Sequence, residues 1–255
     1  MFDYRIPDIK AALEQIGIQA GDDIFIHSNI GFFGRMNECK KREILCKAFL
    51  DTILTVISES GTLVVPTFSY SFCHGEIFSP IETPTGCGLL SQYVIQQKNA
   101  VRSLDPNFSV ASIGMRAVHY TKNPTNESFG KGSFFDRFIQ NNGKIICMNF
   151  DAGSTFVHFI EKQNNVSYRY NKAFNGTIID GNKKIRDYFV HFVYSLKRPE
   201  DAPDLTAVHS LCRSSGILKT ANLGKGTMLA MESQTYCEVI SEELKRRPRF
   251  MTKGK

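Results

Sequence analysis

The stretch IFIHSNIGFFG, residues 24–34, decides how this chain folds. Its first three residues are consecutive apolar side chains, which is typical of a strand covered on both faces, and the glycine-bearing remainder predicts a loop. Apolar residues then recur at helical spacing over 44–56, and a second apolar strand follows at 63–65, where Pro66 ends it. Strand, loop, helix and strand in this order predict a βαβ unit with parallel strands.

The same order returns later in the chain. The residues predict a helix near 133–140, a strand over 144–150 and a helix over 154–163. Ahead of the first strand, Asp8 is placed to cap a short helix that Gly17 ends. This alternation of strands and helices favours a mostly parallel central sheet flanked by helices.

The C-terminal third has a different pattern. From Thr177 the sequence predicts a β-hairpin with Asp180-Gly181 as its turn and the aromatic-rich stretch 188–194 as its second strand. Helices are expected over 205–214 and 233–246, with a strand over 227–231 between them. We therefore predict an α/β fold in a single domain, 1–255, with a core over 1–175 and an antiparallel β-hairpin and helical extension over 176–255.

Composition narrows the class of protein. The 255 residues, 42% of them hydrophobic, are enough for a sizeable core, and no apolar run approaches the roughly 18 residues that a membrane helix needs. The first ten residues lack the basic and apolar pattern of a signal peptide, so we expect a cytoplasmic protein without membrane contact. Seven cysteines form an odd set with no CxxC pair, which predicts reduced thiols and no metal site.

The net charge of +6 favours anionic partners. Lysine and arginine are distributed along the chain apart from the cluster KRRPR at 245–249, and no nucleic-acid module is recognisable. We therefore expect no nucleic-acid partner, and phosphorylated small molecules fit the charge.

Ligands collect in open α/β sheets beyond the carboxyl ends of the strands, where residues 27–34, 66–70 and 151–158 are expected. The first of these segments offers amides and hydroxyls suited to an anion or an amide chain, although an ordinary turn has the same composition. It is neither a P-loop nor a GxGxxG motif.

His158 and Glu161 lie three residues apart on a predicted helix and share a face. A carboxylate beside an imidazole prepares a general base, and a solvated surface pair is the alternative interpretation. Asp151 is placed either to cap this helix or to face the site. A serine hydrolase is disfavoured because no GxSxG motif occurs.

Together these segments resemble the aminoglycoside 3-N-acetyltransferase family. Membership implies an N-acyltransferase that uses acetyl-CoA or another acyl-CoA, transfers the acyl group directly to an amine and needs no metal. The residues that carry the resemblance are IFIHSNIGFFG (24–34), GTLVVPTFSY (61–70), RSLDPNFSVASIG (102–114), FGKGSFFDRF (129–138), GKIICMNFDAGSTFVHFIE (143–161) and, more weakly, YRYNK (168–172).

The resemblance also implies site residues. His158 corresponds to the family's catalytic base, with Glu161 or Asp151 as the carboxylate that orients it. The acceptor would contact Tyr70, Thr155, Arg169 and Lys172, and Ser28, Thr67 or Thr155 would stabilise the oxyanion. The acyl-CoA would lie along His27, Ser28, Asn29, Ile30, Gly31, Phe33, Gly34, Thr67, Ser69, Ser109 and Val110.

Two features depart from the family. Asp105 stands where many members have histidine in the segment RSLDP. The chain is also basic, whereas a polycationic aminoglycoside suits an acidic cleft, so the favoured acceptor is an amino sugar linked to a nucleotide, as in surface-polysaccharide biosynthesis. Arg102, Arg169 and Lys172 would then be phosphate partners. An aminoglycoside, as in antibiotic resistance, is the alternative.

Two other classes stay open: a CoA- or nucleotide-binding protein without activity, and a nucleic-acid-binding protein. The second lacks the expected basic stripe interleaved with aromatic residues. The extension 176–255 is expected on the acceptor side, and its aromatic strand is expected to serve either the acceptor pocket or a homodimer.

Overall fold

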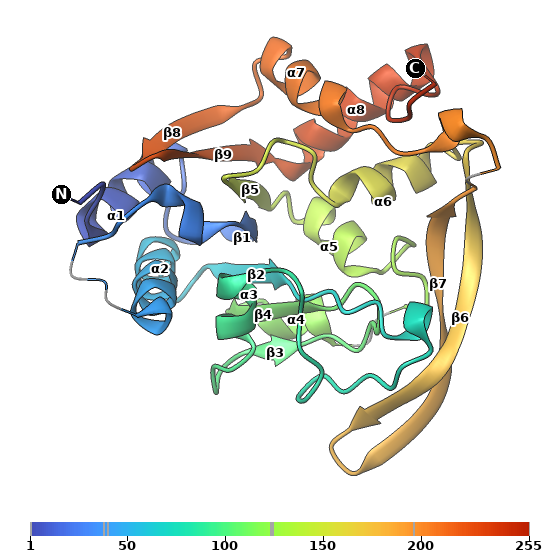
Figure 1. The fold of residues 1–255 in the computed structure, drawn as a ribbon, viewed down its shortest axis with the longest axis horizontal. Helices are drawn as coiled ribbons and strands as arrows, with labels where there is room; N and C mark the ends of the chain where they lie inside the picture. Colours follow the sequence, from blue (N-terminus) through green and yellow to red (C-terminus); the bar gives the residue numbers. More distant parts are fainter. Residues whose placement is uncertain (1, 38, 40, 123–124, 196, 255) are drawn as a thin grey trace.

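A sheet of seven strands forms the centre of the molecule, with the order β3-β4-β2-β1-β5-β9-β8 (Figure 1). The computed structural model describes residues 2–37, 39, 41–122, 125–195 and 197–254. The strands of this sheet are β1 (Asp23–Ser28), β2 (Thr62–Pro66), β3 (Val101–Arg102), β4 (Val110–Gly114), β5 (Lys144–Met148), β8 (Lys219–Leu223) and β9 (Gly226–Glu232).

Parallel pairing is found in the middle of the sheet. β1 pairs in parallel with β2 and with β5, whereas β4, β3, β9 and β8 join antiparallel on either side. The predicted α/β class, the parallel core and the strand over 227–231 are confirmed. The antiparallel strands β3, β4 and β8 have no clear signal in the sequence, because they are short or mix polar and small residues.

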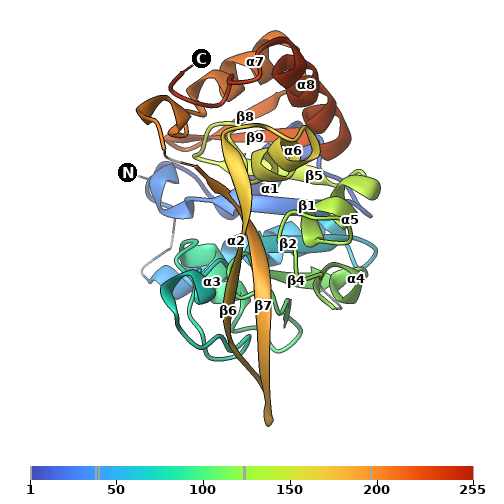
Figure 2. The same ribbon diagram turned by 90° about the vertical axis from the view of Figure 1, so that its right-hand side faces the viewer.

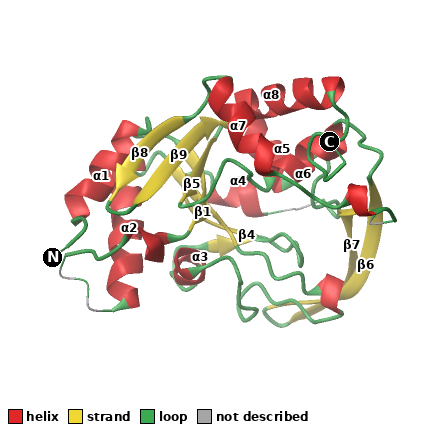
Figure 3. Ribbon diagram, turned by 45° about the horizontal axis from the view of Figure 1, so that its top comes forward, coloured by secondary structure: helices red, strands yellow, loops and turns green. Residues whose placement is uncertain are grey.

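Helices cover both faces of the sheet, with α1 and α2 on one side of the strands and α5, α6 and α8 on the other (Figure 3). Ile24 and Ile26 of β1 pack toward the first group, and Phe25 between them packs toward the second, as the alternation of a strand requires. The helices are α1 (Ile6–Gln15), α2 (Arg42–Ile57), α3 (Leu89–Val94), α4 (Ala117–Thr121), α5 (Phe134–Gln140), α6 (Phe156–Gln163), α7 (Thr206–Ser214) and α8 (Ser233–Arg246), with short 3-10 turns η1 (Ile30–Phe33), η2 (Phe72–His74) and η3 (Pro199–Asp201).

The predicted hairpin is formed by β6 (Arg169–Asp180) and β7 (Lys183–Tyr194), which pair with each other outside the central sheet (Figure 2). It begins well before Thr177, so the boundary expected at residue 175 lies inside β6. Its turn is Gly181-Asn182, one residue later than predicted, because Asp180 still pairs with Lys183. Ile178 and Phe189 of the hairpin pack against η2 and the segment that follows it.

Several element ends differ from the expectation for local reasons. α1 begins at Ile6, so Asp8 lies inside it, where its carboxylate accepts the N–H of Arg5 at 2.7 Å. β5 ends at Met148 because Asn149 has a φ of 57°, a left-handed conformation that a strand does not continue. No helix in the part of the chain that the structure describes is long and apolar enough to cross a membrane.

Candidate active site

The loops that follow β1, β2 and β5 meet at one edge of the sheet. These three strands are neighbours and run parallel, so their carboxyl ends bring the three predicted segments together. α6 begins directly after the third loop. The edge therefore joins backbone amides, hydroxyls and the first turns of a helix, as expected for a ligand site in an α/β fold.

His158 lies on α6 with 22% of its side chain exposed, and its Nδ1 is 3.1 Å from Oε2 of the fully buried Glu161. Arg169, the first residue of β6, joins this pair. Its Nε is 2.7 Å from the same carboxylate oxygen, and its NH2 group is 2.6 Å from Nδ1 of His158. We call these three residues the His158 cluster. A solvated surface pair is excluded, because the carboxylate is buried.

The surroundings keep His158 neutral. Burial lowers the pKa of His158 below its ordinary value, the positive charge of Arg169 lowers it further, and Glu161 acts in the opposite direction. A neutral imidazole is the form that accepts a proton, so the cluster is suited to a general base at neutral pH.

The hairpin supplies two residues that the sequence did not identify. Tyr194 lies opposite Arg169, with its ring 3.6 Å from the guanidinium carbon and its hydroxyl 3.5 Å from Oε1 of Glu161. The ring of His191 is 4.6 Å from that of Phe108, and burial lowers the pKa of His191 to about 3. These contacts place the aromatic strand against the candidate site of its own chain.

His27, near the end of β1, ties this strand to the start of α6. Its Nε2 lies 3.0 Å from the hydroxyl of Ser154 and accepts the N–H of Thr155 at 3.3 Å. Burial lowers the pKa of His27 to about 4, so the imidazole stays neutral. In this structure His27 positions the helix that carries His158.

The predicted donor loop is anchored by its apolar residues. Ile30 and Phe33 are buried in the core on the α1 and α2 side, so their side chains do not border open space. Gly34 has a φ of 91° and lies against the side chain of Asp3, a conformation and a contact that disfavour any larger residue. These three residues therefore shape the loop.

Other residues of the same loop face outward or lack partners. Asn29 is partly exposed, and Gly31 is exposed with open space where a Cβ would be. The hydroxyl of Ser28 is buried and has no hydrogen-bond partner among the residues that the structure describes. Asn29 and Gly31 are therefore open to a ligand in this structure.

Thr67, Ser109 and Val110 were expected to lie along the acyl-CoA. All three are fully buried, so they do not line a channel in this structure. The guanidinium of Arg102 donates from Nε to both hydroxyls, each at 3.1 Å, and from NH2 to the carbonyl of Thr67 at 2.7 Å. Its NH1 group donates to the carbonyl of Thr83. Arg102 is therefore a structural residue and is closed to a phosphate.

The loop after β2 also makes mostly internal contacts. The Ser69 hydroxyl donates to the carbonyl of Pro106 at 2.9 Å. Tyr70 is partly exposed, and its ring lies 5.1 Å from that of Phe108. Asp105, which departs from the family pattern, accepts two backbone N–H groups at 2.9 Å, from Asn107 and Phe108, and so closes a turn. Tyr70 is thus an exposed member of this loop.

Asp151 and Lys172 lie apart from the His158 cluster. The Asp151 carboxylate accepts the N–H of Gly153 at 2.8 Å, which makes it a turn residue, and it is Glu161 that contacts His158. Lys172 is exposed on β6, with its ammonium 4.8 Å from the ring centre of Phe174. Arg169, expected to bind substrate, is instead buried within the cluster.

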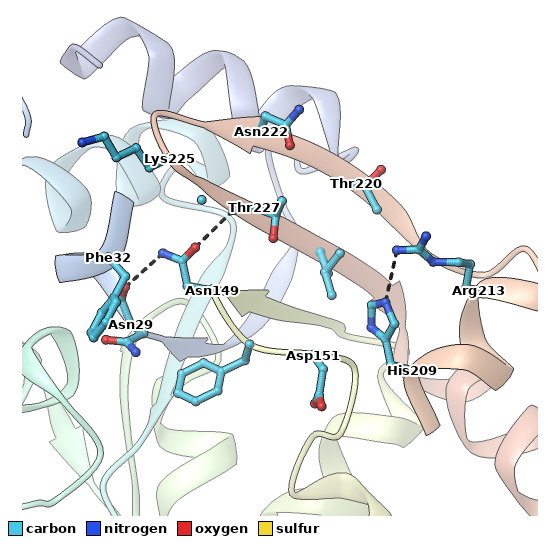
Figure 4. Close-up of a pocket in the computed structure, with 13 residues that line it drawn as sticks. Asn29, Phe32, Asn149, Asp151, His209, Arg213, Thr220, Asn222, Lys225 and Thr227 are labelled. Carbon is cyan, nitrogen blue, oxygen red and sulfur yellow. Dashed lines mark hydrogen bonds between the residues drawn. The ribbon is translucent and has the colours of Figure 1, made fainter. Parts of the chain in front are cut away.

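A pocket of about 870 Å³ opens beside the predicted donor loop (Figure 4). The figure places Phe32 and Lys225 on one side of it, His209 and Arg213 on the other, and Asn149 and Thr227 between them. Its lining residues are Asn29, Phe32, Asn149, Phe150, Asp151, His209, Arg213, Thr220, Asn222, Lys225, Gly226, Thr227 and Leu229. Of these, Asn29 and Asp151 were among the predicted site residues.

Known proteins share both the sequence pattern and the fold. Aminoglycoside N(3)-acetyltransferase III of Serratia marcescens is 23% identical over 176 residues, which cover 61% of this chain and 63% of that protein. The matched region thus spans less than two thirds of the relative.

Two solved structures have the same fold. One is AAC-IIIb in a binary complex with CoASH, with a TM-score of 0.81 at 15% identity, covering 95% of this chain and 97% of the other. The second is AAC-VIa bound to sisomicin, with a TM-score of 0.81 at 16% identity, covering 96% and 98%.

The model of the aminoglycoside 3-N-acetyltransferase family matches residues 25–245. This region includes the three loops at the sheet edge, the His158 cluster and the hairpin. The chain therefore belongs to the aminoglycoside 3-N-acetyltransferase family.

Proposed function

We propose that this protein is an N-acetyltransferase that transfers the acetyl group of acetyl-CoA directly to an amine of an aminoglycoside. The observation that carries the proposal is the His158 cluster, in which a partly exposed neutral imidazole contacts a buried carboxylate at 3.1 Å. The family, and the CoASH and sisomicin bound by its structural relatives, support the donor and the acceptor.

In this mechanism His158 acts as the general base. With Nδ1–H donated to Glu161, the lone pair of Nε2 is available to remove a proton from the acceptor ammonium or from the attacking amine. The amine nitrogen forms a bond to the thioester carbonyl carbon, the carbon–sulfur bond breaks, and CoA leaves as the thiolate. The negative charge of Glu161 stabilises the imidazolium that forms.

Arg169 influences which nitrogen of His158 carries the proton. Nδ1 has an acceptor, Glu161, and a donor, Arg169, both within hydrogen-bond distance. A neutral imidazole uses one of them at a time, and only donation to Glu161 leaves Nε2 unprotonated. The ion pair of Arg169 with Glu161 thus holds the carboxylate beside the ring while competing for the same nitrogen.

Ser28 is our candidate for the oxyanion donor. Its hydroxyl lacks a partner among the described residues, at the end of β1, whereas the hydroxyl of Thr67 is already bonded to Arg102 and Ser109. The N–H of Thr155 is already donated to His27. A free, preorganised hydroxyl can stabilise the tetrahedral oxygen, which is worth roughly 10²–10³-fold in rate.

A nucleotide-linked amino sugar is the second candidate acceptor, and charge is the observation that favours it. The chain carries a net charge of +6, and Glu161, the carboxylate beside His158, is already paired with Arg169. A polycationic acceptor gains little from a carboxylate that is neutralised in this way. A sugar nucleotide is partly anionic, so its binding does not require an unpaired carboxylate.

The deciding experiment is free-thiol release from acetyl-CoA by the purified protein, with aminoglycosides and amino-sugar nucleotides as acceptors. His158→Ala is measured beside His119→Ala, an exposed histidine on α4 that serves as the matched control. We expect turnover on an aminoglycoside that is lost in His158→Ala alone. Turnover on sugar nucleotides only identifies the second acceptor, and no turnover on either class rejects the proposed activity.

A further inference from the structure

Tyr194, the last residue of β7, contacts all three residues of the His158 cluster. Its ring centre lies 3.6 Å from the guanidinium carbon of Arg169, and its hydroxyl lies 3.5 Å from Oε1 of Glu161. Its ring also meets that of His158 edge-on, with 6.4 Å between the centres and 90° between the planes. The base of the hairpin lies beside α6 (Figure 1), so one aromatic side chain reaches the whole cluster.

Polar partners hold the guanidinium of Arg169 at its edge. Its Nε lies 2.7 Å from Oε2 of Glu161, its NH2 group lies 2.6 Å from Nδ1 of His158, and its NH1 group donates to the carbonyl of Phe192 at 2.6 Å. The N–H groups of arginine lie in the plane of the guanidinium, so these contacts restrain the group within that plane. A separation of 3.6 Å is the contact distance of stacked carbon atoms, so the ring of Tyr194 restrains the flat face.

Tyr194 is itself held in place by the hairpin. It pairs directly with Arg169 across the two strands, and its ring stacks on that of the fully buried Tyr168, with 6.1 Å between the centres and 14° between the planes. The backbone N–H of Ser195 donates to the carbonyl of Tyr168 at 2.8 Å, which closes the base of the hairpin. Tyr194 is therefore a rigid support for the guanidinium.

The ring of Tyr194 supplies this support, and its hydroxyl adds little. A hydroxyl group makes an effective hydrogen bond to another oxygen at about 2.5–3.0 Å. The hydroxyl of Tyr194 is 3.5 Å from the carboxylate of Glu161, which is longer. A cation over an aromatic face is attracted to the ring, and the attraction grows when water is excluded. The side chain of Arg169 is 1% exposed, so this condition is met.

We propose that Tyr194 is a positioning residue of the acetyltransferase, whose ring holds the guanidinium of Arg169 in the plane of its contacts with Glu161. The carboxylate is thereby kept beside Nδ1 of His158. The inference rests on the proposed function for the reaction, and it adds a residue of β7 that acts through its neighbours. Without the ring, the guanidinium is free to leave this plane, and Glu161 loses the ion pair that fixes it.

The test compares Tyr194→Leu, which removes the ring, with Tyr194→Phe, which removes the hydroxyl alone. Tyr188, a half-exposed tyrosine on the same strand, gives the matched controls Tyr188→Leu and Tyr188→Phe. We expect kcat to fall about tenfold in Tyr194→Leu with KM for both substrates unchanged, and to stay within about twofold of the wild type in Tyr194→Phe and in both controls. A raised KM with unchanged kcat would make Tyr194 a substrate contact, and equal losses in both Tyr194 variants would assign the effect to the hydroxyl. Either result overturns the inference.

A double-mutant cycle tests whether Tyr194 acts through the arginine. If it does, Tyr194→Leu causes no further loss of kcat in the background of Arg169→Met, because the group that the ring supports is already absent. Tyr188→Leu in the same background is the control. Losses that multiply in the double variant would show that Tyr194 acts independently of Arg169 and would overturn the inference.

The protonation of His158 provides a readout that needs no turnover. Burial lowers the pKa of His158 and the charge of Arg169 adds to this, so release of the guanidinium in Tyr194→Leu should raise this pKa, whereas Tyr194→Phe should leave it unchanged. Titration of the ring nitrogens by NMR measures it, with the signals assigned by their loss in His158→Ala. Among the described residues, the charged and titratable groups around this ring are Glu161, Arg169, His27, His191 and Tyr194.

Failure of the inference and failure of the proposed function give different results. If the wild type turns over an amine while Tyr194→Leu matches it in kcat and in the titration, the positioning role is overturned and the proposed function stands. If no amine is turned over but Tyr194→Leu alone shifts the titration, the support of the cluster by Tyr194 stands and the acetyltransferase is rejected. Circular dichroism establishes that each variant is folded, and Tyr194→Met, a flexible side chain without a ring, replaces Tyr194→Leu if the latter does not fold.

Discussion

Two buried arginines, Arg102 and Arg169, sit in very different surroundings. Arg102 donates to hydroxyl and carbonyl oxygens of Thr67, Ser109 and Thr83, all of them neutral. Burial lowers the pKa of Arg102 to about 10. Arg169 lies 2.7 Å from the carboxylate of Glu161 and 2.6 Å from Nδ1 of His158.

The two networks differ in whether they reach a titratable group that is exposed to solvent. The network around Arg102 is sealed and joins the ends of β2, β3 and β4, whereas the network around Arg169 ends in an imidazole that is partly exposed. A reaction needs a titratable group that a substrate can reach, and only the second network has one. Residues of both networks matched the family pattern, so position in a motif does not by itself decide the role.

The strongest test of this distinction compares His158→Ala with Ser109→Ala. Loss of the base should reduce kcat/KM by about 10²–10⁴-fold. Ser109→Ala should leave kcat/KM close to that of the wild type and lower the free energy of unfolding by about 1–3 kcal/mol, because Arg102 loses an acceptor. Thiol-release assays and urea unfolding on both proteins measure the two effects, and equal loss of activity in both would contradict the separation.

Removing the guanidinium of the buried Arg102 should lower the stability of the fold. Arg102→Met removes the guanidinium donor from the carbonyl of Thr83 and one of the two donors from both the carbonyl of Thr67 and the hydroxyl of Ser109, so we expect the free energy of unfolding to fall by about 3 kcal/mol. Urea denaturation followed by circular dichroism measures this change, with Lys98→Met at an exposed site as the control. An unchanged unfolding midpoint would show that the network adds nothing to stability.

Removing the charge of the other arginine should act on the pH dependence. Burial is the largest cause that lowers the pKa of His158, and the charge of Arg169 adds to it. Arg169→Met should therefore raise this pKa and move the acidic limb of the profile of kcat/KM against pH to higher pH.

Arg169→Lys separates charge from folding in the same experiment. It keeps the positive charge beside Glu161, so its acidic limb should stay closer to that of the wild type. Circular dichroism and thermal unfolding establish that both variants are folded. If the limb is in the same place in Arg169→Met and in the wild type, Arg169 has no electrostatic effect on the base.

The smallest expected effect concerns His27 and stability in acid. Its pKa is lowered from 6.5 to about 4, so between these values the unfolded chain binds the proton that the folded protein does not. Stability is therefore complete above pH 6.5 and is lost as the pH falls toward 4. At pH 5.5 the loss is about 1 kcal/mol, and His27→Asn should remove this part of the pH dependence. Urea unfolding at pH 7.5 and 5.5 measures it, with His119→Asn as the control that should keep the wild-type slope.

Much of the fold could be predicted because its signals are local. Three continuous apolar stretches mark β1, β2 and β5, and helical spacing marks α2 and α8. The hairpin was predicted, but its register was not. A turn at Asp180-Gly181 would place Phe192 opposite Arg169, whereas the turn at Gly181-Asn182 places Tyr194 there. One residue of turn position thus decides which side chain meets the guanidinium.

The sequence by itself determined the class of fold, the sheet edge at which the three loops meet and the His158–Glu161 pair, because each depends on periodicity or on spacing along one element. Only the tertiary structure decided which other residues belong to the site. Arg169 joins from the hairpin, the side chains of Thr67 and Ser109 turn inward to Arg102, and the pocket at the donor loop takes a wall from α7, β8 and β9. Contacts between elements distant in sequence depend on packing and register, and local patterns do not encode them.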